Sequence, residues 1–264
     1  MMPPASFTAA LMTPPMTALR PPHSASSIAN PILAALDLTT TDSALALAAQ
    51  LRDTVGGIKL GLEFYMAAGG AGVAQLAELG LPIFLDLKFH DIPNTVAGAI
   101  RAVAGLRPFM TNVHAAGGRA MMLAARDAAR DSAAKLGVTP PKLIAVTVLT
   151  SLNGADLADV GQATDPVDQV RRLAALARQC ELDGVVCSPQ EIAVLRRDLG
   201  PDFLLVTPGI RPSWAASGDQ KRITTPEEAV RAGASYLVIG RPITADKDPA
   251  MAARRIQADI TANI

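Results

Sequence analysis

Short apolar runs alternate along the chain with longer segments whose apolar residues recur at helical spacing. Each run is continuous rather than alternating, which is typical of strands in a parallel sheet covered on both faces. The segments between them are rich in alanine and leucine and predict helices, for example at residues 42–53, where Asp42 or Ser43 is the expected cap, and at 249–260. The predicted strands are residues 32–37, 57–61, 82–87, 109–114, 143–149, 183–187, 203–207 and 235–240.

Eight strand–helix units in a chain of 264 residues predict a closed (β/α)8 barrel, a TIM barrel, folded as a single domain. We expect this catalytic domain to span residues 30–264. Residues 1–29 contain no acidic residue and many Pro, Ser, Thr and Ala, so we expect a disordered N-terminal extension there. Active sites of such barrels lie at the carboxyl ends of the strands, and that is where the polar residues matter.

The composition argues against several classes of partner. Lys plus Arg equal Asp plus Glu at 24 each, and aromatic residues make up 3% of the chain, so neither net charge nor stacking favours nucleic acid. An apolar segment of about 20 residues, which a membrane span needs, is absent from the sequence. The two cysteines, Cys180 and Cys187, are too few for a disulfide framework, so we expect reduced thiols and a cytoplasmic protein.

Charged residues stand at the ends of the first three predicted strands. Asp37 closes the first strand, Lys59 lies in the second, and the segment FLDLKFHDIPNT at 84–95 carries Asp86, Lys88 and Asp91. Buried charges are costly unless they are paired, so we expect these side chains to converge at the mouth of the barrel. A structural ion-pair network is the alternative. Further polar residues at predicted strand ends are Asn112, His114, Thr150, Ser151, Gly240 and Arg241.

The loops after the seventh and eighth strands have the composition of a phosphate site. Barrels commonly hold a phosphate there with main-chain N–H groups, and Gly209 and Gly240 allow close approach of the backbone. Arg211 and Arg241 add planar guanidinium groups suited to a phosphate, and Gln220 lies where a mobile loop could carry an amide to the ligand.

Lys88 lies between two acids in sequence, and this position favours one kind of chemistry. A lysine that forms a Schiff base needs a neutral amine, whereas flanking carboxylates favour the ammonium form. The carboxylates would repel a carboxylate on the substrate, and the ammonium could protonate the carbanion left when CO2 departs. The D-x-K-x-x-D spacing therefore favours decarboxylation over aldol chemistry.

Several motifs together resemble the bacterial type of the orotidine 5′-phosphate decarboxylase family. They stand in the expected order and span about residues 31–250. The motifs are FLDLKFHDIPNT, TNVHAAGG, IAVTVLTS, DGVVCS, LVTPGIRP, GDQKRI and VIGRPIT. The resemblance implies conversion of orotidine 5′-phosphate to UMP and CO2, the last step of de novo UMP synthesis, without a metal or an organic cofactor.

The resemblance also implies roles for individual residues. Lys88 matches the proton donor, Asp86 faces the substrate carboxylate, and Lys59 and Asp91 complete the catalytic array. Asp91 and Thr95 reach the neighbouring site of a homodimer. The implied substrate-binding residues are Asp37, Lys59, Asp86, Asp91, Ile92, Thr95, Thr150, Ser151, Pro208, Arg211, Gln220, Gly240 and Arg241.

Two alternatives remain at this point. Asp86 and Asp91 could bind Mg²⁺, as in related barrels that decarboxylate keto-sugar phosphates, but those resemble a pattern with a glutamate where this chain has Lys59, and Glu63 falls past the strand. A non-catalytic nucleotide-binding barrel is the other. His114 is predicted to be a hydrogen-bonded structural residue, and His90 to orient its loop.

Overall fold

The computed structural model describes residues 30–215 and 224–262. The predicted extension at 1–29 and the predicted ligand residue Gln220 lie outside the described residues.

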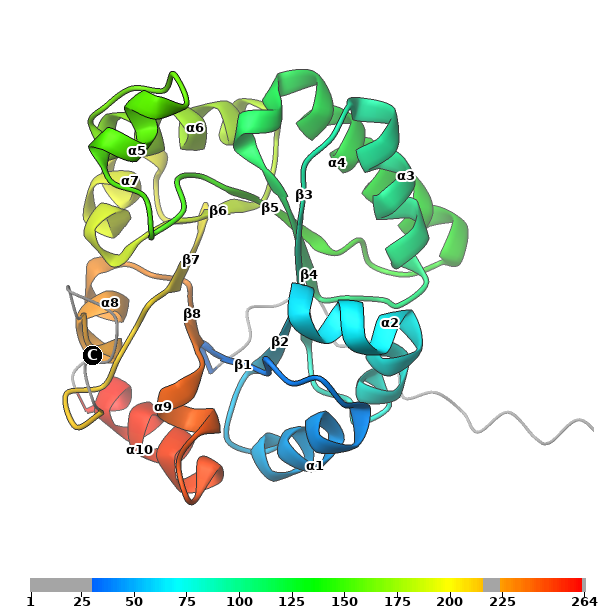
Figure 1. Cartoon of the computed structure of the whole chain (residues 1–264), viewed down its shortest axis with the longest axis vertical. Coiled ribbons are helices and arrows are strands. Elements are labelled where there is room, and N and C mark those ends of the chain that lie inside the picture. The colour runs from blue at the N-terminus through cyan, green and yellow to red at the C-terminus, as the bar shows by residue number, and fades with distance from the viewer. Residues whose placement is uncertain (1–29, 216–223, 263–264) are drawn as a thin grey trace, which may run out of the picture.

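Eight parallel strands close into a barrel in sequential order, with β8 paired to β1 (Figure 1). This is the TIM-barrel architecture that the sequence predicts, and every predicted run overlaps one of the strands. The strands are β1 (Ile32–Ala35), β2 (Gly57–Gly61), β3 (Ile83–Phe89), β4 (Met110–His114), β5 (Lys142–Val146), β6 (Gly184–Val186), β7 (Leu204–Pro208) and β8 (Tyr236–Ile239).

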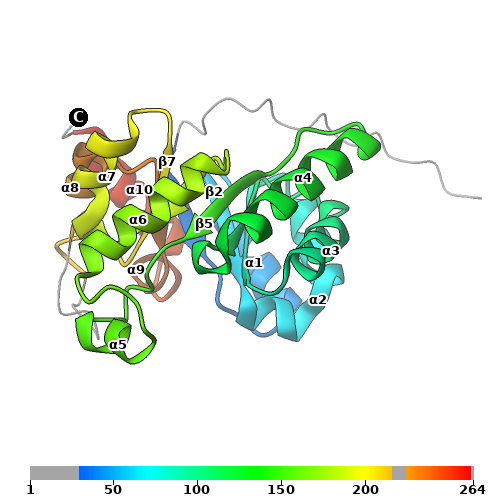
Figure 2. The same ribbon diagram turned by 90° about the horizontal axis from the view of Figure 1, so that it is seen from above.

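Helices surround the strands and shield the barrel from solvent (Figure 1). They are α1 (Thr41–Leu51), α2 (Leu62–Ala77), α3 (Pro93–Ala104), α4 (Gly118–Leu136), α5 (Gly154–Asp159), α6 (Pro166–Gln179), α7 (Ile192–Leu199), α8 (Pro226–Ala232), α9 (Arg241–Thr244) and α10 (Pro249–Thr261), with 3-10 turns η1 (Ala115–Gly117) and η2 (Pro189–Glu191). Figure 2 shows α5 beyond one end of the barrel. This is the end at which β5 terminates, since α5 follows β5 in the chain.

The two helices singled out in the sequence are present, with one correction. The N-cap of α1 is Thr40, whose hydroxyl accepts a hydrogen bond from the N–H of Ser43, so neither Asp42 nor Ser43 caps the helix. Thr40 has an extended backbone, as an N-cap requires, whereas Asp42 and Ser43 already lie inside the first turn. The last helix begins at Pro249, its predicted first residue.

Apolar side chains form two layers of core. A large cluster fills the space between strands and helices. A smaller one consists of residues from six different strands, and such residues can meet only inside the barrel. Its members are Leu33, Phe84, Met110, Ile144, Val206 and Tyr236. This smaller cluster fills the interior of the barrel, so polar side chains that could act on a ligand are confined to the ends of the strands.

Both cysteines are free thiols and both are buried. Burial raises the pKa of Cys187 to about 12 and also raises the pKa of Cys180. Within the described ranges, no helix combines the length and the apolar character needed to cross a membrane.

Candidate active site

Asp86 is the centre of a charged array at the carboxyl ends of the first strands. Its Oδ1 atom lies 2.7 Å from Nζ of Lys88, and its Oδ2 atom lies 3.7 Å from Nζ of Lys59. Lys59 also pairs with Asp37 at 3.0 Å. The side chains of Lys59 and Asp86 are almost fully buried, whereas that of Asp37 is about half exposed (52%). The four charges therefore run from the buried mouth of the barrel out to solvent.

Lys88 has an unusual backbone conformation. Its φ angle is +52°, in the left-handed region that a lysine occupies at a cost of roughly 1–2 kcal/mol. The pairing of β3 with β4 is irregular here: Leu85 pairs with Thr111 and Phe89 with Val113, so β3 has two more residues than β4 between these points. Such bulges redirect side chains next to active sites. Here the bulge contains both Asp86 and Lys88.

Asn112 of β4 occupies the gap opposite the bulge. Its Nδ2 donates a hydrogen bond to Asp86 Oδ1 at 2.7 Å, and its Oδ1 accepts one from the Lys88 N–H at 2.8 Å. The side chain is completely buried. The sequence marks Asn112 as a polar residue at a strand end, but it does not show that the amide joins both members of the Asp–Lys pair.

Asp91 does not join the array within one chain. It lies beyond the end of β3, is exposed, and its Oδ1 accepts a hydrogen bond from the N–H of Ile92 at 2.6 Å. Lys88 is therefore paired with one carboxylate of its own chain, Asp86, and not held between two as the spacing suggests. The reason is geometric: the strand ends at Phe89, and Pro93 starts α3, so the intervening residues turn outward.

The segment around Asp91 forms an open, exposed hollow of about 490 Å³. Ile92 is 66% exposed although it is a large apolar residue, and Thr95 on the first turn of α3 is exposed as well. The hollow is lined by His90, Asp91, Ile92, Pro93, Ala116 and Gly117.

His114 packs its ring against that of His90, with centroids 5.3 Å apart and planes inclined by 29°. Burial lowers the pKa of His114 below its ordinary value, and the neighbouring His90 and Lys88 lower it further. A neutral imidazole is thus favoured at this position. The predicted structural role fits this packing, and the contact that the structure gives is a ring stack.

Thr150 and Ser151 lie farther from the barrel than the sequence predicts. β5 ends at Val146, and the two residues are exposed in a turn in which the Leu152 N–H donates to the Leu149 carbonyl. The buried hydroxyl nearest the strand end belongs to Thr147, which donates to the Val186 carbonyl at 2.8 Å. A continuous apolar run cannot by itself mark where β5 stops, because the loop that follows is apolar too.

Those predicted phosphate residues that the structure describes lie at or just after the ends of β7 and β8, which are paired through Pro208 and Val238. Gly209 has φ +78°, a conformation that favours glycine. Arg211 is buried. Its main-chain N–H donates a hydrogen bond to the Thr224 carbonyl at 3.1 Å, and this bond connects the two described sides of the long loop.

On the neighbouring strand, Gly240 is the N-cap of α9, and Arg241 is the first residue of that short helix. Both follow β8 directly, so they lie at the same end of the barrel as the charged array.

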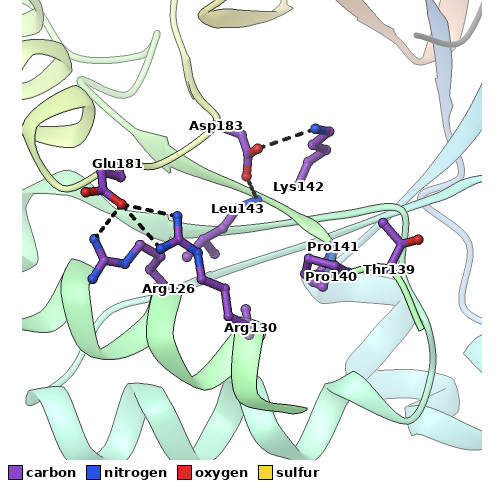
Figure 3. Close-up of a pocket in the computed structure, with 10 residues that line it drawn as sticks. Arg126, Arg130, Thr139, Pro140, Pro141, Lys142, Leu143, Glu181 and Asp183 are labelled. Atoms are coloured by element: carbon purple, nitrogen blue, oxygen red, sulfur yellow. Dashed lines mark hydrogen bonds and ion pairs between the residues drawn. The ribbon is translucent and has the colours of Figure 1, made fainter. Parts of the chain in front are cut away.

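A separate cavity of about 240 Å³ lies at the opposite end of the barrel, where β5 and β6 begin (Figure 3). Its charged groups pair with each other: Glu181 with Arg126 and Arg130 at 3.2 and 3.3 Å, and Asp183 with Lys142 at 3.5 Å. In TIM barrels, residues at the amino-terminal ends of the strands contribute mainly to stability, and active sites lie at the carboxyl-terminal ends. We therefore place the candidate site at the carboxyl-terminal end.

The metal-dependent alternative lacks a ligand cluster in the described part of the chain. There, no three or more His, Cys, Asp or Glu residues are grouped in a way that could hold a metal ion. Glu63 lies in the first turn of α2, past the end of β2, and Lys59 occupies the strand.

Comparison with known proteins gives a consistent result. The model of the family "Orotidine 5'-phosphate decarboxylase / HUMPS" matches residues 30–256. Orotidine 5′-phosphate decarboxylase of Rhodospirillum rubrum is 61% identical over 232 residues, which are 88% of this chain and 94% of that protein. The namesake from Paramagnetospirillum magneticum is 54% identical over 88% of this chain and 98% of its own length. The crystal structure of the Lactobacillus acidophilus enzyme superimposes with a TM-score of 0.77 at 38% identity, covering 88% of this chain and 99% of that one.

Proposed function

The chain belongs to the orotidine 5′-phosphate decarboxylase family, and from this premise we propose how its charged array removes CO2 from orotidine 5′-phosphate. It is a carboxy-lyase of pyrimidine biosynthesis that leaves UMP as product. The observation that supports the proposed mechanism best is the position of Asp86, a buried carboxylate with an ammonium group on each oxygen.

Asp86 acts on the substrate carboxylate by repulsion. Two carboxylates about 4 Å apart repel each other by of order 4 kcal/mol at an effective dielectric of about 20, and Lys59 and Lys88 reduce this value. The repulsion disappears when the C6 carboxylate leaves as CO2. The interaction therefore favours the transition state over the bound substrate, which is the condition for raising kcat.

Lys88 completes the reaction as the proton donor. The bond between C6 and the carboxylate carbon breaks, its electron pair stays on C6, and neutral CO2 departs. The ammonium of Lys88 then transfers one proton to C6 to give UMP, and the amine regains a proton from solvent. An ammonium already paired with Asp86 also stabilises the negative charge that develops at C6.

The remaining predicted residues bind the parts of the nucleotide that do not react. We assign the ribose hydroxyls to Asp37 and Lys59, the pyrimidine edge to Thr150 and Ser151, and the phosphate to the β7 and β8 loops. Thr150 and Ser151 would reach the base by an inward movement of their exposed loop. The phosphate-side residues are Pro208, Arg211, Gln220, Gly240 and Arg241. Binding at the remote phosphate can stabilise closure around the reacting base.

A homodimer would explain the two features around Asp91. The residue is exposed and separate from Lys88 in its own chain, and the adjacent Ile92 leaves a large apolar side chain in solvent. In a two-fold dimer, Asp91, Ile92 and Thr95 of one chain would reach the site of the other. The proposal includes a cytoplasmic location and catalysis without metal or organic cofactor.

Replacement of the proton donor tests this function. Lys88→Ala is expected to lower kcat by at least about 10²–10⁴-fold, the usual contribution of a positioned general acid, while UMP still binds. The assay follows the loss of orotate absorbance, with and without a chelator. Lys142→Ala, which removes a lysine paired with Asp183 at the other end of the barrel, is the control and should retain activity. Full activity of Lys88→Ala would refute the assigned role, and chelator-sensitive activity would favour the metal-dependent alternative.

A further inference from the structure

Asn112 is the one described side chain that hydrogen-bonds to both ends of the bulge in β3. The bulge replaces regular pairing between β3 and β4, and so removes the strand partner that the Lys88 N–H would otherwise have. Asn112 Oδ1 accepts from that N–H at 2.8 Å. The residues are 24 positions apart in sequence, so the contact exists only because β4 lies beside β3.

The chemistry of the two contacts fixes the orientation of the amide. A backbone N–H can only donate, so the oxygen of Asn112 must face Lys88. An ionised carboxylate can only accept, so the NH2 group must face Asp86. Both conditions are met at once, with Nδ2 at 2.7 Å from Asp86 Oδ1. An ionised aspartate, which resembles asparagine in shape, could satisfy only the contact with the Lys88 N–H, and leucine could satisfy neither.

The same oxygen of Asp86 accepts from Asn112 and from Lys88 Nζ, each at 2.7 Å. One buried amide thus fixes the rotamer of the carboxylate and the backbone of the lysine that binds it. Two contacts therefore position the ammonium of Lys88: its ion pair with Asp86, and the hydrogen bond from the Lys88 main-chain N–H to Asn112.

We propose that Asn112 is a positioning residue for decarboxylation, which holds the left-handed backbone of Lys88 and the carboxylate of Asp86 so that ammonium and carboxylate face the reacting carbon together. This inference rests on the roles proposed above for Asp86 and Lys88. It assigns no contact between Asn112 and the substrate.

The first test compares two buried polar residues of β4. Asn112→Ala should lower kcat by at least about 50-fold, because misplacement by about 1 Å costs of order 10²-fold. KM and the affinity for UMP should change by less than about fivefold. Thr111→Val is the matched control: Thr111 is equally buried and donates to the Leu85 carbonyl at 3.0 Å, but neighbouring strand residues point to opposite faces. It should lose thermal stability and keep kcat within about threefold.

The second test uses an isosteric change whose effect depends on pH. In Asn112→Asp the new carboxyl group can still accept from the Lys88 N–H but repels Asp86. Two carboxyls this close hold a shared proton to higher pH, and the protonated form again donates to Asp86. The ratio of variant to wild-type kcat should therefore rise at least about threefold as the pH falls from about 8 to about 5.5. If Asn112→Ala does not fold, this variant decides the question.

Three outcomes would overturn the proposal: Asn112→Ala with kcat within about threefold of wild type, a kcat loss in Thr111→Val as large as that in Asn112→Ala, or a ratio for Asn112→Asp that does not change with pH. If Lys88→Ala is inactive and any of these three outcomes is observed, only the proposed role of Asn112 is refuted. An active Lys88→Ala removes the proposed mechanism itself.

Discussion

Gly61 leaves the space that the ammonium of Lys59 occupies. A Cβ atom at position 61 would lie 2.8 Å from Lys59 Nζ and 3.5 Å from Asp37 Oδ1. Gly61 has φ −96°, which any residue can adopt, so backbone strain is no reason for a glycine here. The space itself is the reason, and the group that needs it belongs to the charged array.

Gly61→Ala is therefore expected to lower activity without unfolding the protein. The methyl group displaces a flexible ammonium and no main-chain atom, so the melting temperature should change little. Loss of the Lys59–Asp37 and Lys59–Asp86 geometry should lower kcat/KM by about 10–100-fold. Gly105→Ala is the control, since Gly105 has helical angles and open space around its Cβ position. Equal kinetics for the two variants would show that the position of Lys59 is not critical.

Asp86→Asn should separate binding from catalysis. The amide has the shape of the carboxylate but not its charge, so orotidine 5′-phosphate is no longer repelled. We expect its affinity relative to that of UMP, which lacks the carboxylate, to rise at least about tenfold, while kcat falls by about 10²-fold or more.

The measurement for Asp86→Asn is a pair of dissociation constants, determined under conditions in which the variant turns over slowly. UMP serves as the internal control because it contacts the same sugar and phosphate sites. An unchanged ratio of the two constants would argue against electrostatic repulsion by Asp86.

Mixing inactive variants tests whether Asp91 acts in the partner's site. Lys88→Ala and Asp91→Ala should each be inactive alone. After dissociation and random reassociation, half of the dimers are mixed, and each mixed dimer has one site with both an intact Lys88 and an intact Asp91. Activity should therefore return to roughly one quarter of the wild-type value. Mixtures that stay inactive would place Asp91 in the site of its own chain.

His114 should make stability depend on pH. Its folded-state pKa is lowered by burial first, then by His90 and Lys88, against an opposing effect of Asp86. The unfolded chain therefore binds the proton more tightly. The stability that the neutral form contributes is fully present above about pH 6.5 and is lost as the pH falls through the folded-state pKa.

Urea unfolding at several pH values checks this expectation. The free energy of unfolding of the wild type should fall more steeply between about pH 7.5 and 5 than that of His114→Gln, which does not titrate. Parallel curves over the whole interval, separated only by a constant offset from the lost ring stack, would contradict the titration of His114.

Much of the site could be predicted from the sequence for a simple reason. Runs such as 57–61 and 82–87 are buried on both faces, so they must be continuous and apolar, and any charge within them requires a purpose. Lys59 and Asp86 stand out on this basis, Lys88 follows directly after the second run, and parallel strands bring their carboxyl ends to one face.

Other features could not be predicted because they depend on contacts between distant parts of the chain. Asn112 lies 26 residues from Asp86, and nothing in its local sequence indicates that it bridges a bulge. The outward turn of Asp91, the end of β5 at Val146 and the cap at Thr40 depend on where hydrogen bonding stops, which a pattern of apolar residues marks only loosely.

The sequence by itself determined the alternation of strands and helices, the closed barrel and the set of charges at its mouth, since burial permits few other arrangements of these residues. Only the tertiary structure decided which charge pairs with which, and at what angle. The pairing of Asp86 with Lys88 depends on the register between β3 and β4, where a bulge, a left-handed lysine and one buried amide are joined by hydrogen bonds.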